Sequence, residues 1–269
     1  MLGNDGHFYV VKFRNNPQHV RVLANEYLAA KLAAAVGLST PVVDVVEVRS
    51  WLIENTPELE MDLGRTRERC LPGLHFGSRF AGGTMPGQLV DYLAEEQLAA
   101  VKNIAEFAGI LALDKWTGNA NGRQAVFTRK ARERRYNATF IDFGYCFFAG
   151  EWKFEDVPLR GVYYRNDVYR DITGWESFEP WLSRLETMPA ETVWGAANSI
   201  PPEWYGDESE LTALVEKLLA RRSRIRESIE AFGRSDRKPF PNWGLQGSET
   251  SSAVWSDARW GATIADRIM

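Results

Sequence analysis

Residues 140–144, Phe-Ile-Asp-Phe-Gly, constrain this chain more than any other segment. Their apolar residues predict a buried strand, and Asp142 then lies where that strand ends. An aspartate so placed, with Phe and Gly after it, is suited to hold Mg²⁺ against the phosphates of a nucleotide. Alone the tripeptide is a weak signal, because Asp and Gly are also ordinary turn residues. Its meaning therefore depends on the motifs that precede it.

A lysine and a glutamate come earlier in the chain, in the order that phosphate binding requires. Residues 9–13 predict a short strand with Lys12 inside it, and residues 18–36 have helical apolar spacing up to Gly37. Glu26 lies within this helix. A buried ammonium group needs a partner, so we predict that Glu26 orients Lys12 and that Lys12 contacts the α- and β-phosphates of ATP.

Composition sets the outer limits. The 269 residues are 45% hydrophobic and 25% charged, which is enough for a sizeable core in one domain or two lobes. The net charge of −4 argues against a general nucleic-acid role. No apolar run is long enough to span a membrane, and no signal peptide is recognisable. Cys70 and Cys146 fit no metal or disulfide pattern, so we expect a cytoplasmic protein with both cysteines in its core.

The pattern of elements predicts an α+β fold with two lobes, of the protein-kinase type. Residues 1–85 are expected to form a small mixed lobe, residues 86–232 a mainly helical lobe, and residues 233–269 an irregular tail rich in Pro and Ser. Within the second lobe we predict helices over 91–115 and 208–232, and a hairpin of strands 125–129 and 139–142.

Residues 71–83 occupy the place of a hinge between the two lobes. Their glycines would let a backbone edge approach an adenine ring, whose donors and acceptors main-chain groups can recognise. We therefore count His75 and Phe76 among the candidate nucleotide-binding residues. A glycine-rich surface turn is the alternative interpretation.

The joint order of the motifs resembles the HipA-like kinases, a bacterial family related to the protein and phosphatidylinositol kinase fold. This resemblance implies ATP- and Mg²⁺-dependent transfer of a phosphoryl group, often to a serine or threonine of a protein. It also implies a toxin–antitoxin or stress context. The segments that carry it are residues 5–13, 23–26, 34–41, 114–121, 140–144 and 200–205.

In this family the general base is an Asp two residues after an Asn that follows Gly, and Asn121 holds that position here. An amide cannot accept a proton as a carboxylate does. Three accounts are open: a base-inactivated variant, a natural pseudokinase, or an enzyme whose base is Asp114, five residues before Asn119. We favour Asn121 as the base position, because its separation from Asp142 suits a single hairpin, and interpret Asp114 as a helix-end anchor.

The metal site is predicted around Asp142, since a magnesium ion on phosphates needs at least one protein carboxylate. The usual metal-binding Asn is replaced by Val126, so Asn119 or Gln124 would supply the missing oxygen. Arg123 would reach the γ-phosphate as a bidentate donor. Asn119 capping a turn, and Arg123 pairing with Glu133 or another surface acid, are the structural alternatives.

The N-terminus is short for such a lobe, with eleven residues before Lys12. We expect part of the first strand and glycine-rich loop to be missing, and the N–H groups of Gly3 and Gly6 to form a residual turn over the phosphates. A second basic feature lies near the C-terminus, where we expect a solvated face rather than a phosphate or nucleic-acid surface. Its members are Arg221, Arg222, Arg224 and Arg226.

The sequence therefore predicts an ATP- and Mg²⁺-dependent phosphotransferase acting on a protein Ser or Thr, with activity in doubt because of Asn121. A nucleotide-binding pseudokinase or scaffold, and a small-molecule kinase, are the alternatives. ATP and a protein substrate are the expected partners, with no membrane and no nucleic acid.

Overall fold

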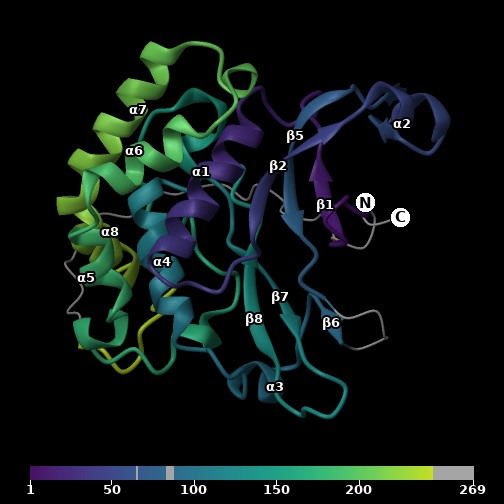
Figure 1. The fold of residues 1–269 in the computed structure, drawn as a ribbon. Helices are drawn as coiled ribbons and strands as arrows, with labels where there is room; N and C mark the ends of the chain where they lie inside the picture. The colour runs from purple at the N-terminus through teal and green to yellow at the C-terminus, as the bar shows by residue number, and fades with distance from the viewer. Residues whose placement is uncertain (65, 83–87, 245–269) are drawn as a thin grey trace.

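The computed structural model describes residues 1–64, 66–82 and 88–244 as a mixed α/β fold (Figure 1). The strands are β1 Tyr9–Lys12, β2 Val43–Val48, β3 Glu60–Asp62, β4 Arg67–Arg69, β5 Gly73–Arg79, β6 Leu89–Val90, β7 Gln124–Thr128 and β8 Asn137–Ile141. The helices are α1 Val22–Ala35, α2 Ser50–Asn55, α3 Glu95–Ala99, α4 Glu106–Thr117, α5 Trp181–Glu186, α6 Ala190–Asn198, α7 Glu208–Ala220 and α8 Ile225–Gly233. Short 3-10 turns, η1 to η5, connect several of them, at Cys146–Glu151, Asn166–Tyr169, Trp175–Phe178, Pro202–Trp204 and Arg221–Arg224.

The N-terminal sheet is antiparallel with the order β1-β5-β2. Lys12 lies opposite Phe76 and Val10 opposite Ser78, so these four side chains share one face of the sheet. Helix α1 packs on that face, because Phe76 belongs to the same buried core as the apolar residues of α1. The other face is covered by α2 and the β3–β4 hairpin, which close a small second core of Phe13, Val48, Ile53 and Cys70.

The second sheet has the order β6-β7-β8, and the predicted hairpin is its β7–β8 pair. Successive residues along each strand lie on opposite faces of the sheet, and the two faces differ in burial. Ala125, Phe127, Ala138 and Phe140 are buried in the main core, whereas Gln124, Val126, Thr139 and Ile141 are only partly covered. One face of this sheet is thus built to pack and the other to meet solvent or a ligand.

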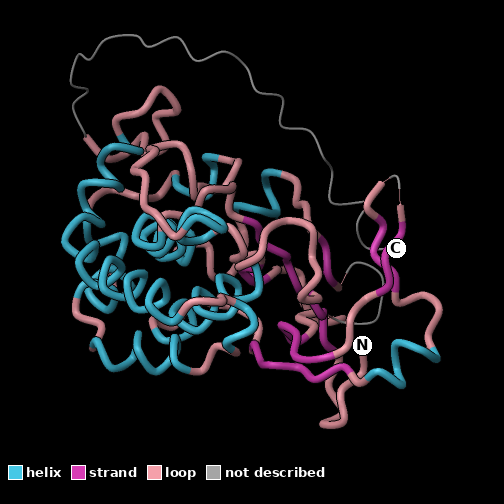
Figure 2. Tube along the Cα trace, turned by 90° about the horizontal axis from the view of Figure 1, so that it is seen from above, coloured by secondary structure: helices cyan, strands magenta, loops and turns pink. Residues whose placement is uncertain are grey.

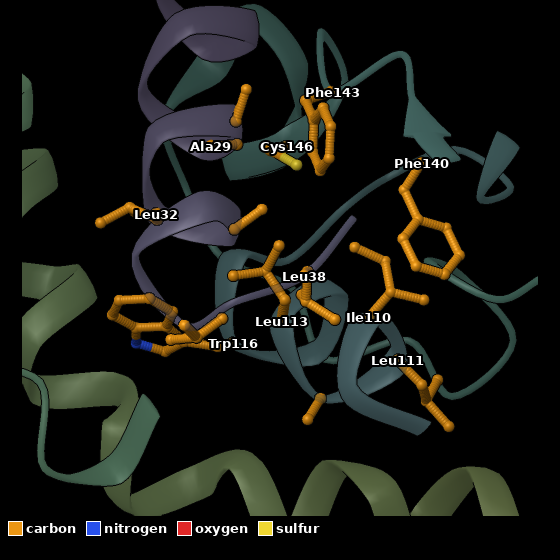
Figure 3. Packing of buried hydrophobic residues seen from close by; sticks show 14 of the residues in the cluster. Ala29, Leu32, Leu38, Ile110, Leu111, Leu113, Trp116, Phe140, Phe143 and Cys146 are labelled. Atoms are coloured by element: carbon orange, nitrogen blue, oxygen red, sulfur yellow. The ribbon is translucent and has the colours of Figure 1, made fainter. Parts of the chain in front are cut away.

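The main core lies between α1, α4 and the second sheet. Figure 3 shows Leu113 and Trp116 of α4 close to α1, and Ile110 of α4 beside Phe140 of β8. Trp116 is fully buried and its indole N–H donates to the carbonyl of Leu218, 2.8 Å away. Most helices gather on one side of the molecule and the strands on the other (Figure 2).

The two long helices expected from sequence are each interrupted. The predicted helix over 91–115 is wrong for residues 91–94 and 100–105. In the second stretch, Lys102 and Asn103 bond instead to the backbone beside and within β8, at Tyr136 and Ala138. The predicted helix over 208–232 breaks at η5, where the Arg221 side chain turns inward. In both places tertiary hydrogen bonds outweigh helix propensity.

The prediction of a hinge over residues 71–83 is wrong for most of its length. Residues 73–79 form β5, the central strand of the N-terminal sheet, so their backbone groups are bonded to strands on both sides. No free edge is left there for an adenine ring. The remainder of the segment includes residue 83, which lies outside the described residues.

The beginning of the expected tail packs against the body. The ring of Trp243 lies 4.9 Å from that of Trp175 and 6.0 Å from that of Phe178, and Phe240 is buried. The remaining predicted tail residues, from 245 onward, lie outside the described residues. Within the described ranges, no helix has both the length and the apolar character of a membrane span.

Gly109 in the middle of α4 provides a test of this packing. An added Cβ there would lie 2.5 Å from the Trp181 ring and 2.9 Å from Leu38. We expect Gly109→Ala to destabilise the fold by about 1–3 kcal/mol through overpacking, although alanine favours helix. Gly195→Ala in α6, where nothing lies within 4 Å, is the matched control and should stabilise by about 0.5–1 kcal/mol. Urea unfolding measures both, and equal effects would contradict this packing.

Candidate active site

Lys12, Glu26 and Asp142 meet at one point, although they come from β1, α1 and the residue after β8. The Lys12 ammonium donates to the Glu26 carboxylate and, at 2.7 Å, to Asp142 Oδ1. The sequence prediction that Lys12 pairs with Glu26 agrees with this geometry. The contact with Asp142 joins the N-terminal sheet to the second sheet.

The charges of this trio depend on one another. Burial opposes the charge on Lys12, yet the carboxylates of Glu26 and Asp142 raise its pKa above the ordinary value. Burial raises the pKa of Glu26 against the attraction of Lys12. Burial also disfavours the anion at Asp142, but Lys12 outweighs it and holds the pKa of Asp142 below its usual range. At neutral pH the ammonium and the Asp142 carboxylate are therefore charged.

The backbone around Asp142 is unusual. Its φ angle of 62° lies in the left-handed region, which is uncommon for a residue with a side chain. The next N–H, of Phe143, donates to Glu26 Oε2 at 2.9 Å and so helps to hold this conformation. Strained backbone of this kind gathers at functional sites when the surroundings over-determine it. Glu26 therefore fixes both Lys12 and the segment that carries Asp142.

Gln124 is the amide that the fold brings to Asp142. It lies opposite Ile141 in the β7–β8 pair, and its side-chain N–H donates to Asp142 Oδ2. Among the described residues, no three His, Cys, Asp or Glu side chains form a ready-made metal cluster. A carboxylate and an amide oxygen nonetheless suit Mg²⁺, which takes few protein ligands when phosphates supply the others. The donor set fits a magnesium ion bound together with a nucleotide.

Asp114 and Arg123 form a buried ion pair beneath this site. Arg123 donates through Nε at 2.9 Å and Nη2 at 2.5 Å to the two Asp114 oxygens, and both side chains are almost fully buried. Its Nη1 donates to the carbonyl of Ile141 at 2.7 Å. The prediction that Arg123 reaches the γ-phosphate, and its alternative pairing with Glu133, are both wrong, because the guanidinium is used inside the fold.

Asp114 as an alternative base is also excluded by this geometry. Only 1% of the residue is exposed, and Asn119 donates to it at 2.9 Å in addition to Arg123. The Asn119 oxygen in turn accepts the N–H of Asn121 at 3.0 Å. Asn119 thus caps the turn rather than presenting its oxygen beside Asp142, so the interpretation of Asp114 as a helix-end anchor agrees with the structure.

Asn121 lies at the half-exposed tip of this loop. Its side-chain oxygen accepts the N–H of Gly122 at 2.8 Å, and its carbonyl accepts the N–H of Gly161 at 3.0 Å. The loop is tied to the segment after Asp142, because Ala120 donates its N–H to the carbonyl of Tyr145. Of the two candidate base positions, only Asn121 can meet a substrate.

The N-terminal glycines do form a turn, but not the predicted phosphate cradle. Gly3 donates its N–H to the carbonyl of His7 at 2.8 Å, and Gly6 donates to Gly3 at 3.1 Å. The prediction that these N–H groups bind phosphates is therefore wrong, since both are used within the turn. The turn joins Leu2 and Phe8 in a short antiparallel pair directly before β1.

His75 and Phe76 are buried within β5, and neither presents itself to a ligand. His75 Nδ1 accepts the N–H of Arg14 at 3.0 Å, and its ring packs against Phe13. Phe76 is part of the main core. Their assignment as nucleotide-binding residues is wrong for the same reason as the hinge, namely the central position of β5.

The basic face near the C-terminus is not a solvated face throughout. Arg221 is buried, bonds to Asp156 at 2.7 Å and donates to the carbonyls of Lys115 and Trp116. Arg226 pairs with Glu186. The remaining arginines of the face also have partners within the chain: Arg222 at Met188 and Leu219, and Arg224 at Asp156 and Glu227.

Two features of the site escaped the sequence analysis. Phe8 and Val10 share the face of Lys12, and they are 58% and 53% exposed although apolar. Alternation along the strand would have identified them, because residues two apart point the same way. Asn25, a fully buried amide next to Glu26, is the other feature. A polar residue on the apolar side of a helix was its only signal.

The model of one protein family, described as HipA-like kinase, matches residues 2–234. The chain belongs to the HipA-like kinase family. The matched range contains Lys12, Glu26, Asn121 and Asp142, and it confirms the resemblance seen in the motifs. No curated protein matches the chain.

Solved structures similar to this HipA-like kinase are themselves kinase-like. The Helicobacter pylori proinflammatory kinase CtkA has 13% identity and a TM-score of 0.52, over 87% of this chain and 92% of CtkA. Hydra Fam20, determined with sugar, has 10% identity and a TM-score of 0.50, over 88% of this chain and 81% of its own. At such identities the likeness establishes the fold alone, and the two-lobed kinase-like class predicted from sequence is confirmed.

Breaking the buried Asp114–Arg123 pair should lower the unfolding free energy far more than breaking a surface pair. Asp114→Asn leaves the Arg123 guanidinium buried without a counter-charge, so we expect a loss of about 3–5 kcal/mol in unfolding free energy. Glu133→Gln, which breaks the partly exposed pair with Lys102, is the control and should change the unfolding free energy little. Chemical denaturation measures both, and similar losses would contradict the burial argument.

His75 should make stability depend on pH. Burial lowers the pKa of His75 to about 4, from an ordinary value of 6.5. The unfolded chain then binds a proton that the folded chain excludes, so stability falls as pH falls from 6.5 towards 4, by up to about 1.4 kcal/mol per pH unit. In His75→Gln this contribution is absent, so the stability gap between parent and variant should narrow at acid pH. A gap that is constant from pH 7 to pH 4.5 would disprove the assignment.

Proposed function

We propose that this chain binds ATP with Mg²⁺ and that its site is built for phosphoryl transfer to a serine or threonine of a protein. The observation that carries the proposal is the contact of Lys12 with both Glu26 and Asp142. A cation held between a helix carboxylate and a strand-end aspartate is the arrangement that binds nucleotide phosphates in kinases. Family membership supports the reaction class, and the protein acceptor is inferred from the resemblance.

The nucleotide is proposed to lie between the two sheets. Phe8 and Val10 leave an apolar wall on the face of Lys12, and Val126 and Ile141 are half-covered on the second sheet. Apolar walls with a few convergent polar groups are typical of such sites. The base ring would contact the apolar residues, and Lys12 would hold the α- and β-phosphates.

The magnesium ion is proposed to be held by Asp142 with the side-chain oxygen of Gln124. When bound, Mg²⁺ neutralises charge on the phosphate oxygens. Lys12 and Glu26 orient the phosphates, while the buried Asp114–Arg123 pair supports the loop that presents Asn121. Because Gln124 donates its N–H to Asp142 in this structure, its amide would turn to present the oxygen to the metal.

Asn121 favours a second candidate function, a nucleotide-binding pseudokinase. Its amide can orient a substrate hydroxyl, but it cannot take the proton that leaves as the hydroxyl attacks the γ-phosphorus. We therefore infer that the chain as given transfers phosphate slowly or not at all while still binding nucleotide. A cytoplasmic setting and a toxin–antitoxin context stay predictions from the cysteines and the resemblance.

Restoring the carboxylate is the test. In Asn121→Asp we expect transfer from γ-labelled ATP, to the chain itself or to dephosphorylated casein, to rise by about 100-fold or more, the usual contribution of a general base. The double variant Asn121→Asp with Asp142→Asn should be inactive, because it lacks the metal-binding carboxylate. Nucleotide affinity, measured by calorimetry, should be similar in the parent and Asn121→Asp.

The outcomes separate the two candidates. If Asn121→Asp transfers no phosphate but still binds ATP, the pseudokinase is favoured. Failure of both forms to bind ATP with Mg²⁺ would sink the nucleotide proposal itself.

A further inference from the structure

The segment that follows Asp142 has a backbone that few sequences adopt. Phe147, Phe148 and Ala149 have φ angles of 58°, 59° and 58°, and Trp152 has 51°. None of these is glycine, and each left-handed residue with a side chain costs about 1–2 kcal/mol. Something in the surrounding structure must hold this segment, which we call the left-handed loop and define as residues 144–152.

The group that holds it is the side chain of Asn25. This residue is 0% exposed, and its amide nitrogen lies 2.9 Å from the carbonyl oxygens of Gly144 and Cys146 and 2.8 Å from that of Ala149. Its oxygen accepts the indole N–H of Trp152 at 2.8 Å. The amide thus contacts four groups of the left-handed loop, and because its NH₂ has two hydrogens, one of them is shared between two carbonyls.

The physical consequence is a tight dependence of the loop on this one amide. The carbonyl oxygens of Gly144, Cys146 and Ala149 all lie within 2.9 Å of one nitrogen, so their partial negative charges face one another. The NH₂ group of Asn25 supplies the compensating donors in a site that excludes water. Buried polar groups left without such a partner cost about 1–3 kcal/mol each. Without Asn25 the loop would open toward solvent.

The left-handed loop contacts the other parts of the candidate active site. It begins two residues after Asp142, and Phe148 donates its N–H to the carbonyl of Gly118 at 3.1 Å. The carbonyl of Tyr145 accepts the N–H of Ala120, just before Asn121. On the other side, Asn25 is the direct neighbour of Glu26 in α1. Through the left-handed loop, the side chain of Asn25 therefore links helix α1, the segment that carries Asp142 and the loop that carries Asn121.

Two neighbouring residues contact the same loop from the start of α1. His19 Nε2 lies 2.9 Å from the Gly144 carbonyl, and Arg21 donates to the Gly150 carbonyl at 3.1 Å. Arg21 also lies over the Trp152 ring, 4.3 Å from its centre. Neither reaches the three converging carbonyls together, so they brace the outside of the loop while Asn25 fills its centre.

We propose that Asn25 is a positioning residue that locks the left-handed loop against α1 and thereby sets the geometry of Asp142 for the metal–nucleotide complex. Only the part of this proposal that concerns Asp142 and the metal–nucleotide complex rests on the proposed function. Asn25 touches neither substrate nor metal. It acts through the loop.

The first experiment tests the lock on the chain without any ligand. Asn25→Leu keeps a similar volume but removes the amide, and hydrogen–deuterium exchange is followed over residues 143–152. Exchange there should accelerate by about 10-fold or more relative to the parent, as local opening predicts. Asn166→Ala, which removes an amide paired with Arg237 elsewhere in the chain, is the matched control and should leave that segment unchanged.

A second variant keeps the test decisive if Asn25→Leu does not fold. Trp152→Phe keeps a smaller aromatic ring and removes the indole N–H whose hydrogen bond Asn25 accepts, while Asn25 keeps its three carbonyl contacts, so it should give a smaller acceleration confined to the same segment. Unchanged exchange over 143–152 in whichever variant folds would overturn the lock. Acceleration spread evenly over the whole chain would also overturn it, because that indicates general destabilisation.

The second experiment separates positioning from mere stability. Calorimetry with a non-hydrolysable ATP analogue compares affinity with excess Mg²⁺ and with EDTA. In Asn25→Leu, or in Trp152→Phe if the first variant does not fold, the gain in affinity that Mg²⁺ provides should shrink. A loss of about 10-fold in Asn25→Leu is typical when a residue that orients a metal ligand is removed. Binding in EDTA should change little, and Asn166→Ala should match the parent in both conditions.

An equal loss of affinity with and without Mg²⁺ would overturn the positioning role. If the parent itself does not bind the analogue, the proposed function fails, and the exchange experiment still decides whether Asn25 locks the loop.

Discussion

The ammonium of Lys12, shared between Glu26 and Asp142, is the interaction on which the rest of the structure depends. A buried charge without compensation is far more costly than any single apolar contact. The three residues come from a strand, a helix and a strand end that are distant in sequence, so satisfying this one charge fixes the relative position of both sheets and α1. The same contact holds Asp142 ionised where a metal would need it.

Around this trio, polar residues that would suit catalysis serve the fold instead. Arg123 is bound to Asp114 and to the carbonyl of Ile141, and Asn119 is used on both its donor and acceptor sides. These bonds hold the loop of residues 118–123 in place without exposing a carboxylate on it. The half-exposed tip of this loop carries Asn121, whose amide cannot take up a proton as a carboxylate does.

The left-handed loop extends the same principle to the backbone. Its strained backbone is held because the carbonyls of Gly144, Cys146 and Ala149 converge on the buried amide of Asn25, and His19 also contacts the first of them. Because Asn25 belongs to α1, these hydrogen bonds connect that helix directly to the segment that follows Asp142.

Much of this could be predicted from the sequence, because it depends on local patterns. The strand containing Lys12, the helix containing Glu26, the hairpin before Asp142 and the kinase-like fold follow from periodicity and motif order, which one chain records directly. The lengths of the long helices and the place of the hinge could not be obtained in this way. The first depends on side chains such as Asn103 and Arg221 finding distant carbonyls, and the second on β5 acquiring neighbours on both sides.

The sequence by itself determined which residue types were available: one lysine in a strand, one glutamate in the next helix, one aspartate at a strand end, and an amide at position 121. Only the tertiary structure decided which polar groups bond to one another within the fold and which remain for a ligand. Arg123, Asp114 and Asn119 were removed from the list of candidates, and Gln124 was brought to Asp142. The physical reason is that hydrogen bonds between distant segments are directional and saturable, so a donor's role is fixed only when its acceptor has been placed.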